Sequence, residues 1–575
     1  MKNKFLYLLL ATSTMIGVYA CNKSFLDVTP QGVLDEATLA SEKGVNKLLL
    51  SAYAMLDGHD GGLGLGGEWG SSGSNYLYGS MGAGEANKGS DPGDQGPNMT
   101  PVIRHDITAV NGATNDRWKA LYEGVKRSNT VLQVLAKVSG IDATTQKDLA
   151  GQARFLRAWY HFQARIMYGK VPYLDEKIDA DLSSGAIAGV TNQTDIYPQI
   201  VADAKFAYEN LPEINKERAI GRINKWAAGA LYGKILMFTK DFATAKTVLT
   251  DVVSNGKNSL GTKYALNANF ADNFNTDFDN SKESVFAFQT SSNDNAGGRN
   301  GNWGDNLNTP AAGGMGGAGF FCPTHFFVNN FKTDADGLPL ANPQTTAVIE
   351  PDGAAGYTKY AGTLDPRLDW TIGRNGVAFH DWGFAQSTWK RDISCGPFLA
   401  KKTVIRQAQV ASTHDASLWF ATGGVALNMN LIRFSDVILL AAEAEIEVGS
   451  LENARTLINM VRTRASNTPA VNVDPLSGST TTINAKTYTT AFANQAAART
   501  AVRTERLLEL GLEGHRFFDL VRWGTSTTEI NAYYNYESVF PYQVILKPKP
   551  TYAASSDYYP VPQQQIDLGK GFIKP

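Results

Sequence analysis

Three glycine-rich stretches of the chain combine aromatic rings with side chains that pair well with hydroxyl groups. The C–H face of a sugar ring packs on an aromatic ring, and its hydroxyls hydrogen-bond to Asn, Asp or Arg side chains. The three clusters are Trp69, Asn75, Tyr76 and Tyr78; Arg299, Asn302, Trp303, Asp305 and Asn306; and His380, Asp381, Trp382, Trp389 and Lys390. A single loop aromatic is more often a packing anchor, but we predict that at least one of the three clusters contributes to ligand binding.

Within these clusters, ten residues are the candidate ligand contacts. They are Trp69, Asn75, Tyr76, Tyr78, Arg299, Trp303, Asp305, Asn306, Trp382 and Trp389. Trp69, Tyr76 and Trp303 are flanked by glycine and small polar residues, which let a ring project and let backbone approach a ligand.

Sequence motifs for catalysis are missing from the chain. It contains no HExxH zinc motif, no GxSxG nucleophile elbow and no GxxxxGK[ST] phosphate loop. The string GxGxxG occurs at 62–67 and 314–319, but neither copy follows a predicted strand or opens a helix, so chance explains both. We therefore predict a protein that is not an enzyme and needs no cofactor or metal.

Two acidic stretches have some features of cation sites. Asp334-Ala335-Asp336-Gly337 begins like a calcium loop, but Thr345 occupies the twelfth position, where a bidentate Glu is required. A turn between two strands is the better interpretation. The run from Asp272 to Glu283 has a phenylalanine at a ligand position, and we expect a solvated loop.

Glu505, Glu509 and Glu513 recur every four residues toward the end of the chain. Carboxylates on one helix face could form an acid/base pair. Arginines that can pair with them are interleaved: Arg503, Arg506 and Arg516. We predict a structural ion-pair network, with Arg506 and Glu509 in the scaffold and Trp523 packed beneath them.

The N-terminus reads as an export signal that ends at a cysteine. Lys2 and Lys4 precede an apolar stretch at 5–16, too short to span a bilayer. Val18-Tyr19-Ala20-Cys21 resembles the bacterial lipobox, whose cysteine is acylated. We predict a signal peptide at 1–20 and a permanent lipid anchor on Cys21; the alternative is an ordinary signal peptide that happens to meet a cysteine.

Composition limits the remaining partners. Without residues 1–20 the chain keeps 55 acidic residues and loses only two of its 53 basic ones, and no basic block suggests nucleic acid. Cys322 and Cys395 could pair after export, or each could be a small buried residue.

Helical spacing of apolar residues predicts the scaffold. We expect helices near 45–56, 118–135, 149–168 and 195–211, and a last helix over about 496–522. Residues 226–253 match the segment from Ser435 at an offset of 209, each as a helix, a short turn and a second helix. This resembles a tetratricopeptide hairpin, although generic helical hairpins are an alternative.

Six segments in order resemble one known family. They are CNKSFLD with VTPQG (from Cys21), FLRAWYHFQARIMYGKVPYL (155–174), ANFADNFNTDFDNSKESVFAFQ (268–289), the segment 431–465, RTERLLELGLEGHRFFDLVRWG (503–524) and YYPVPQQQID (558–567). Together they are similar to SusD/RagB outer-membrane lipoproteins of Bacteroidetes.

The resemblance implies a mostly α fold with four tetratricopeptide-like hairpins, large irregular loops and minor β structure. After the signal peptide, it implies a single domain over 21–575. The scaffold would comprise about 35–56, 116–253 and 431–524, with ligand-site loops at about 57–115 and 290–425.

The resemblance also implies a function: capture of nutrients, commonly glycans, at the cell exterior. The implied partner is a SusC-like TonB-dependent transporter in the outer membrane. Family binding residues lie in variable loops, so none can be assigned here from a motif. The alternative is a helical-repeat adaptor that binds another protein; aromatics in glycine-rich loops favour the first hypothesis.

Overall fold

The computed structural model describes residues 39–58, 69–183, 190–214, 219–345, 347–350, 358–392, 396–418, 420–479 and 482–575. The signal peptide, Cys21, the 62–67 glycine motif and Cys395 lie outside these ranges.

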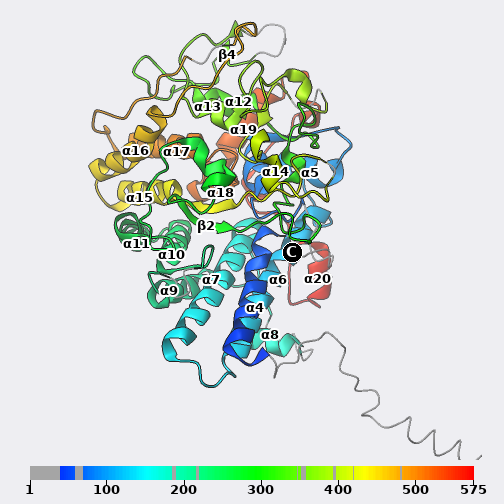
Figure 1. Cartoon of the computed structure of the whole chain (residues 1–575), viewed down its shortest axis with the longest axis vertical. Helices are drawn as coiled ribbons and strands as arrows, with labels where there is room; N and C mark the ends of the chain where they lie inside the picture. The colour runs from blue at the N-terminus through cyan, green and yellow to red at the C-terminus, as the bar shows by residue number, and fades with distance from the viewer. Residues whose placement is uncertain are drawn as a thin grey trace, which may run out of the picture.

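Within the described residues, nine helices form a scaffold in which each packs on the next along the chain. Figure 1 shows them along the lower and left parts of the molecule, with the irregular segments above and to the right. They are α4 (Glu42–Ala54), α6 (Gly112–Leu135), α7 (Ala143–Tyr168), α9 (Tyr197–Asn210), α10 (Lys225–Thr239), α11 (Phe242–Asn255), α15 (Phe434–Val448), α16 (Leu451–Ser466) and α17 (Gln495–Leu510).

Local sequence explains where these helices begin and end. The side chains of Ser41, Asn111 and Asp142 cap α4, α6 and α7 by accepting hydrogen bonds from backbone N–H groups of the first turn. Such a cap contributes about 1 kcal/mol. Gly169, with φ of 71°, ends α7 as predicted.

The predicted repeat is present as two hairpins, α10–α11 and α15–α16. Ala245 and Ala454, at equivalent positions of the two second helices, are both fully buried. Although residues 256–433 separate the hairpins in the chain, α11 packs directly on α15. The tetratricopeptide-like scaffold is therefore continuous in space across a long insertion.

The last predicted helix, 496–522, is wrong as a single element. It divides into α17 and α18 (Arg516–Trp523). Leu512 and Gly514 have φ of 66° and 76°, which a helix does not permit, and a β-carbon at Gly514 would lie 2.1 Å from the carbonyl oxygen of Ser74. The chain bends there to meet the loop that begins at Trp69.

The remaining helices are short, and the strands form two-stranded sheets. Two helices follow α18: α19 (Ser526–Glu537) and α20 (Gln563–Leu568). The others are α5 (Gly96–Arg104), α8 (Glu176–Ser183), α12 (His325–Val328), α13 (Leu368–Thr371) and α14 (Val410–Thr413). The antiparallel pairs are β1 (Ala86–Gly89) with β3 (Phe320–Pro323), β2 (Ser284–Phe288) with β8 (Met429–Arg433), and β6 (Ile372–Gly373) with β7 (Leu399–Ala400); β4 (Ala347–Val348) and β5 (Thr358–Lys359) are parallel.

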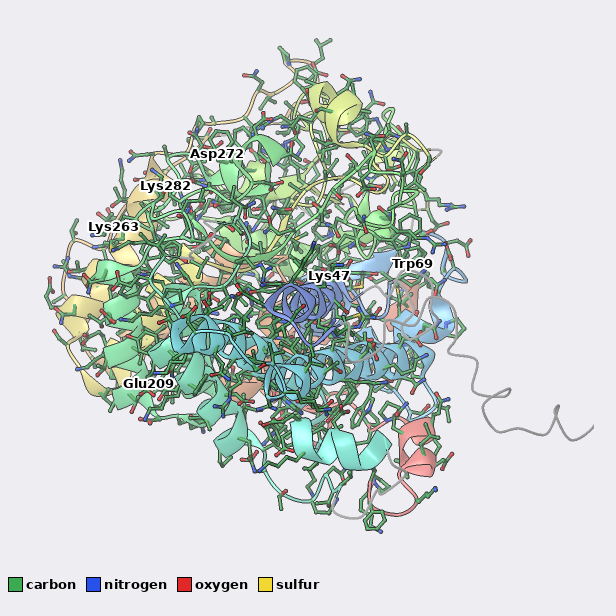
Figure 2. The ribbon with its side chains drawn as sticks, turned by 60° about the horizontal axis from the view of Figure 1, so that its bottom comes forward. Lys47, Trp69, Glu209, Lys263, Asp272 and Lys282 are labelled. Carbon is green, nitrogen blue, oxygen red and sulfur yellow. The ribbon has the colours of Figure 1, made fainter. Side chains whose placement is uncertain are left out.

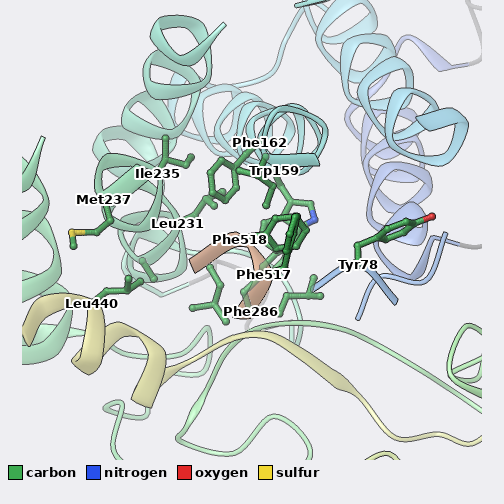
Figure 3. Close-up of a cluster of buried hydrophobic side chains, with 14 of the residues drawn as sticks. Tyr78, Trp159, Phe162, Leu231, Ile235, Met237, Phe286, Leu440, Phe517 and Phe518 are labelled. Atoms are coloured by element: carbon green, nitrogen blue, oxygen red, sulfur yellow. The ribbon is translucent and has the colours of Figure 1, made fainter. Parts of the chain in front are cut away.

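The core lies where α18 and β2 meet the scaffold helices. Figure 3 shows Phe517 and Phe518 of α18 beside Trp159 and Phe162 of α7. Phe286 of β2 packs its ring edge-to-face against Trp159 at 5.2 Å. Burial of such rings contributes roughly 1.5–3 kcal/mol each, so this contact ties the insertion to the scaffold.

The predicted structural ion-pair network is present, but the expected partners are wrong. Its glutamates pair with basic residues from distant segments instead of with the interleaved Arg503, Arg506 and Arg516. The Glu509 carboxylate is fully buried and accepts hydrogen bonds from Arg367, Arg433 and Arg464. Arg506 pairs with Asp436 at 2.7 Å. Trp523, expected beneath Arg506 and Glu509, is half-buried, with the guanidinium groups of Arg503 and Arg522 over its ring at 4.8 and 4.9 Å.

The two acidic stretches differ in outcome. Asp334–Gly337 is a turn, as predicted: Gly337 has φ of 75°, and Thr333 bridges to Pro339 in antiparallel fashion. The expectation of a solvated loop at 272–283 is wrong at both ends: Asp272 is buried, and Glu283 is fully buried and pairs with Arg433 at 3.0 Å and with Arg464 at 3.1 Å. Glu283 thereby joins the network around Glu509.

Three further observations concern cysteine, membrane and metal. Cys322 is disulfide-bonded. Among the described helices, none is both long and apolar enough to cross a membrane. The described residues also contain no group of three or more His, Cys, Asp or Glu side chains arranged to hold a metal ion.

Candidate functional site

The loop that begins at Trp69 is fastened to the scaffold by Arg117 of α6. Its guanidinium donates to the carbonyl of Ser71 at 2.6 Å and to Asn75 Oδ1 at 2.7 Å. Asn75 Nδ2 in turn donates to Gln163 of α7 at 2.8 Å. Asn75, predicted as a ligand contact, therefore has both ends of its amide occupied and anchors the loop.

Tyr76 and Tyr78, both predicted ligand contacts, are each only 1% exposed, so neither ring is accessible to a ligand in this structure. Tyr76 packs edge-to-face on Phe321, and Tyr78 donates its hydroxyl to the carbonyl of Gly70 at 2.8 Å. Burial raises the pKa of both phenols. The flanking glycines permit close packing instead of projection: a β-carbon at Gly79 would lie 1.8 Å from the carbonyl oxygen of Gly514.

Trp69 is the aromatic residue of this cluster that keeps accessible surface. It is half-buried against the core. Figure 2 shows it at the right-hand side of the molecule.

The second cluster divides between buried polar residues and accessible ones. Asp305 is buried and accepts a hydrogen bond from Ser74 at 2.7 Å, and its burial raises the pKa of the carboxyl group. Asn306 is also buried and accepts from the backbone N–H of Gly424 at 2.9 Å. Arg299 is exposed and Trp303 is half-buried, so these two remain candidates for ligand contact.

The third cluster surrounds a small separate core. Trp389 is 7% exposed and packs on Phe379, which makes it a packing residue in this structure. Trp382 is half-buried and donates from Nε1 to the carbonyl of Ile405 at 2.8 Å. Asp381 accepts from the backbone N–H groups of Gln407 and Ala408 at 2.6 and 2.9 Å.

The remaining members of the third cluster, His380 and Lys390, also bond to backbone. His380 Nε2 lies 3.2 Å from the carbonyl of Lys401, and Lys390 donates to the carbonyl of Gly396. Of this cluster, Trp382 keeps accessible ring surface.

The structure brings the three clusters into contact. The Ser74–Asp305 hydrogen bond joins the first to the second. The second continues into Ala311, whose backbone N–H donates to the Trp389 carbonyl at 2.9 Å. Gly313, with φ of 72°, lies against the Trp389 indole, where a β-carbon would come within 2.6 Å of the ring. Segments more than 300 residues apart in sequence, such as 69–78 and 380–390, thus pack together. We call this group of packed loops, which contains the three clusters, the loop body.

A fourth segment of this loop body, residues 410–425, lies within the predicted loop region 290–425, but none of its residues was among the candidate ligand contacts. Asp415 accepts from the backbone N–H of Asn293 at 2.9 Å, and Leu418 packs against Gly298. Phe420 is half-buried beside Gly316 and Gly423. An aromatic residue within a polar stretch was the available signal.

Two family models match the chain. The model of the SusD family covers residues 282–573, about half of the chain. The chain belongs to the SusD family. A second model, described as starch-binding associating with outer membrane, matches residues 78–237.

Other SusD-like proteins resemble most of the chain. A SusD-like protein of Formosa agariphila is 24% identical over 427 residues, covering 73% of this chain and 72% of its own. The crystal structure of a SusD superfamily protein from Bacteroides vulgatus has a TM-score of 0.67 at 22% identity, covering 93% of this chain and 98% of that one.

A second structure with the same fold contains a bound sugar. It is surface glycan-binding protein A of Bacteroides thetaiotaomicron in complex with laminarihexaose, which matches with a TM-score of 0.61 at 18% identity, over 92% of this chain and 98% of that one. These likenesses confirm the predicted fold class, a mostly helical SusD-like architecture.

Proposed function

We propose that this SusD family member is a non-catalytic, glycan-binding protein of the cell surface. The observation that carries the proposal is the joining of three aromatic and polar clusters into one loop body. Trp69, Trp303 and Trp382 are half-buried and Arg299 is exposed, so each offers surface to a sugar. The laminarihexaose complex of a protein with the same fold supports a carbohydrate as the ligand.

The same proposal includes a location and a partner. Lipid on Cys21 would anchor the protein to the outer membrane, facing the exterior. A SusC-like TonB-dependent transporter would then receive the glycan. The family description "associating with outer membrane" supports the location. We also propose that residues 21–575 form a single domain.

Replacing Trp303 by alanine should weaken glycan binding about thirtyfold, because hot-spot aromatics contribute roughly 2 kcal/mol or more. The melting temperature should change little, since the ring is only half-buried. Titration calorimetry against hexasaccharides of different linkage, beginning with laminarihexaose, measures the affinity.

Trp370→Ala is the matched control for this prediction. Its indole is also half-buried but donates to the Pro469 carbonyl, and it belongs to none of the three clusters. Unchanged affinity in Trp303→Ala together with a large drop in melting temperature would make Trp303 a core residue. The same result for Trp69→Ala would favour the protein-adaptor function instead.

Replacing Cys21 by alanine should shift the protein out of the membrane fraction or leave the unprocessed precursor, because the acylated thiol is lost. Labelling cells with a radioactive fatty acid and immunoprecipitating the protein tests this. Label that persists in the Cys21→Ala protein would contradict the anchor assignment.

A further inference from the structure

A pocket of about 580 Å³ lies in the helical scaffold, and none of the ten candidate ligand contacts lines it. Its walls come from the ends of α7, α9 and α10, from α18 and from the segment that carries Tyr558. Three other pockets lined by described residues measure only about 30–40 Å³. A volume of several hundred cubic ångströms is typical of small-molecule sites.

Aromatic rings give this pocket apolar surface that the chain itself does not cover. Tyr558 is 42% exposed. Tyr197 at the start of α9 and Phe238 near the end of α10 are half-buried. All three line the pocket, so aromatic surface forms part of its wall.

Arg165 of α7 is held rigidly between two of these rings. Its guanidinium lies 4.6 Å from the centre of the Tyr197 ring and 5.6 Å from that of Tyr558, and Nε donates to Asp195 at 3.0 Å. Nη1 is buried and has no hydrogen-bond partner among the described residues. Arg165 therefore orders two rings of the pocket wall, and its buried Nη1 is not a donor that a ligand can reach.

Further polar groups stand at the junction of α10 and α11. Lys240 has φ of 61° at the end of α10, is exposed, and makes no ion pair within the described part of the chain. Asp241 caps α11 with Oδ1, which accepts from Thr244 at 3.2 Å, so Oδ2 remains as an acceptor. Donor, acceptor and ring surfaces thus face one volume.

The charges of this pocket do not select an anion. Arg165 is paired with Asp195, and Arg522 donates to Glu443 at 2.6 and 2.7 Å and to Asp519 at 2.8 Å. Lys240 adjoins Asp241. An anion would need unpaired cations, and an acyl chain would need an apolar channel. A ligand rich in hydroxyls, with apolar C–H faces, fits the mixed lining of this pocket better than either.

We propose that this scaffold pocket is a second oligosaccharide site, separate from the loop body. This inference rests on the proposed glycan-binding function but places part of the binding elsewhere. Because the pocket shares none of the accessible residues Trp69, Arg299, Trp303 and Trp382, the two sites can be inactivated independently.

The test uses variants of the detergent-solubilised mature protein in titration calorimetry. The probes are laminarihexaose, maltohexaose, cellohexaose and xylohexaose. Tyr558→Ala removes a stacking ring. Val201→Trp fills the pocket from α9, and Val253→Trp, which introduces the same bulk at a half-buried position of α11, is its control.

We expect two binding events per chain with at least one probe. Tyr558→Ala should weaken one event tenfold or more, Val201→Trp should abolish it, and both should spare the event that Trp303→Ala weakens. A single event that Trp303→Ala weakens and the pocket variants leave unchanged would overturn the second site and leave the proposed function intact. Absence of binding by every probe would overturn both, whereas a single event lost only in the pocket variants would support the pocket against the loop body.

Discussion

Replacing Glu509 by alanine is expected to lower the free energy of unfolding by roughly 3–5 kcal/mol, the usual effect of breaking a buried ion pair. Burial alone would raise the pKa of this carboxyl group, but the guanidinium groups of Arg464, Arg433 and Arg367 hold it well below its usual value. Without Glu509, three buried arginines lose a shared acceptor. Urea denaturation followed by circular dichroism measures the change.

The matched control is Glu452→Ala on α16. Glu452 pairs with Arg455, but it is solvent-exposed, and exposed pairs contribute little because water screens them. The denaturation midpoint of this variant should match that of the unaltered protein. Equal midpoints for Glu509→Ala and Glu452→Ala would show that the network does not stabilise the fold.

Replacing Glu537 by glutamine is expected to stabilise the protein at pH 8 and to have a much smaller effect at pH 5. Burial raises the pKa of this carboxyl group from 4.5 to about 7. The pKa of Glu537 is higher in the folded state than in the unfolded state. Its ionisation therefore does not lower the free energy of unfolding well below pH 4.5, and lowers it by the full amount above pH 7. At about 1.4 kcal/mol per pKa unit, that amount is roughly 3 kcal/mol.

The surroundings of Glu537 can accommodate a neutral side chain. Its carboxylate accepts from the backbone N–H of Phe326 at 2.7 Å and from Gln543 Nε2 at 2.8 Å. Gln543 Oε1 has no hydrogen-bond partner among the described residues. A half-turn of the Gln543 amide would let this oxygen accept from the Glu537→Gln side chain.

Denaturation midpoints of Glu537→Gln and the unaltered protein, compared from pH 5 to pH 8, test this expectation. Glu209→Gln, on the exposed side of α9 (Figure 2), is the control and should show no pH-dependent difference. A constant difference between Glu537→Gln and the unaltered protein over this range would mean that Glu537 titrates normally in the folded state.

The scaffold was predictable because helices leave local signals. Apolar spacing and caps such as Ser41 act within a few turns of chain, and each copy of the repeat at offset 209 is itself a local helical hairpin. The break at Gly511–His515 was missed because its cause is not local: Gly514 must approach the carbonyl of Ser74, more than 400 residues away in sequence.

The loop residues were predictable in kind but not in accessibility. Glycine beside an aromatic residue fits both a ring that stays partly accessible, as at Trp303, and a tightly packed one, as at Tyr76. The fate of each ring depends on partners such as Phe321, which come from other segments. For the same reason the burial of Glu283 was not predictable from its local sequence, because its partners Arg433 and Arg464 are distant in the chain.

The antiparallel pairing of β2 with β8 has a consequence for how such proteins diversify. Ser284 pairs with Arg433 and Phe288 with Met429, so residues 289–428 leave and re-enter the scaffold at one point. The entropy of closing a chain segment grows only slowly with its length, by about 0.6 kcal/mol per doubling. Evolution can therefore lengthen, shorten or exchange stretches of this segment, and with them ligand preference, while the register of the helical repeats on either side stays the same.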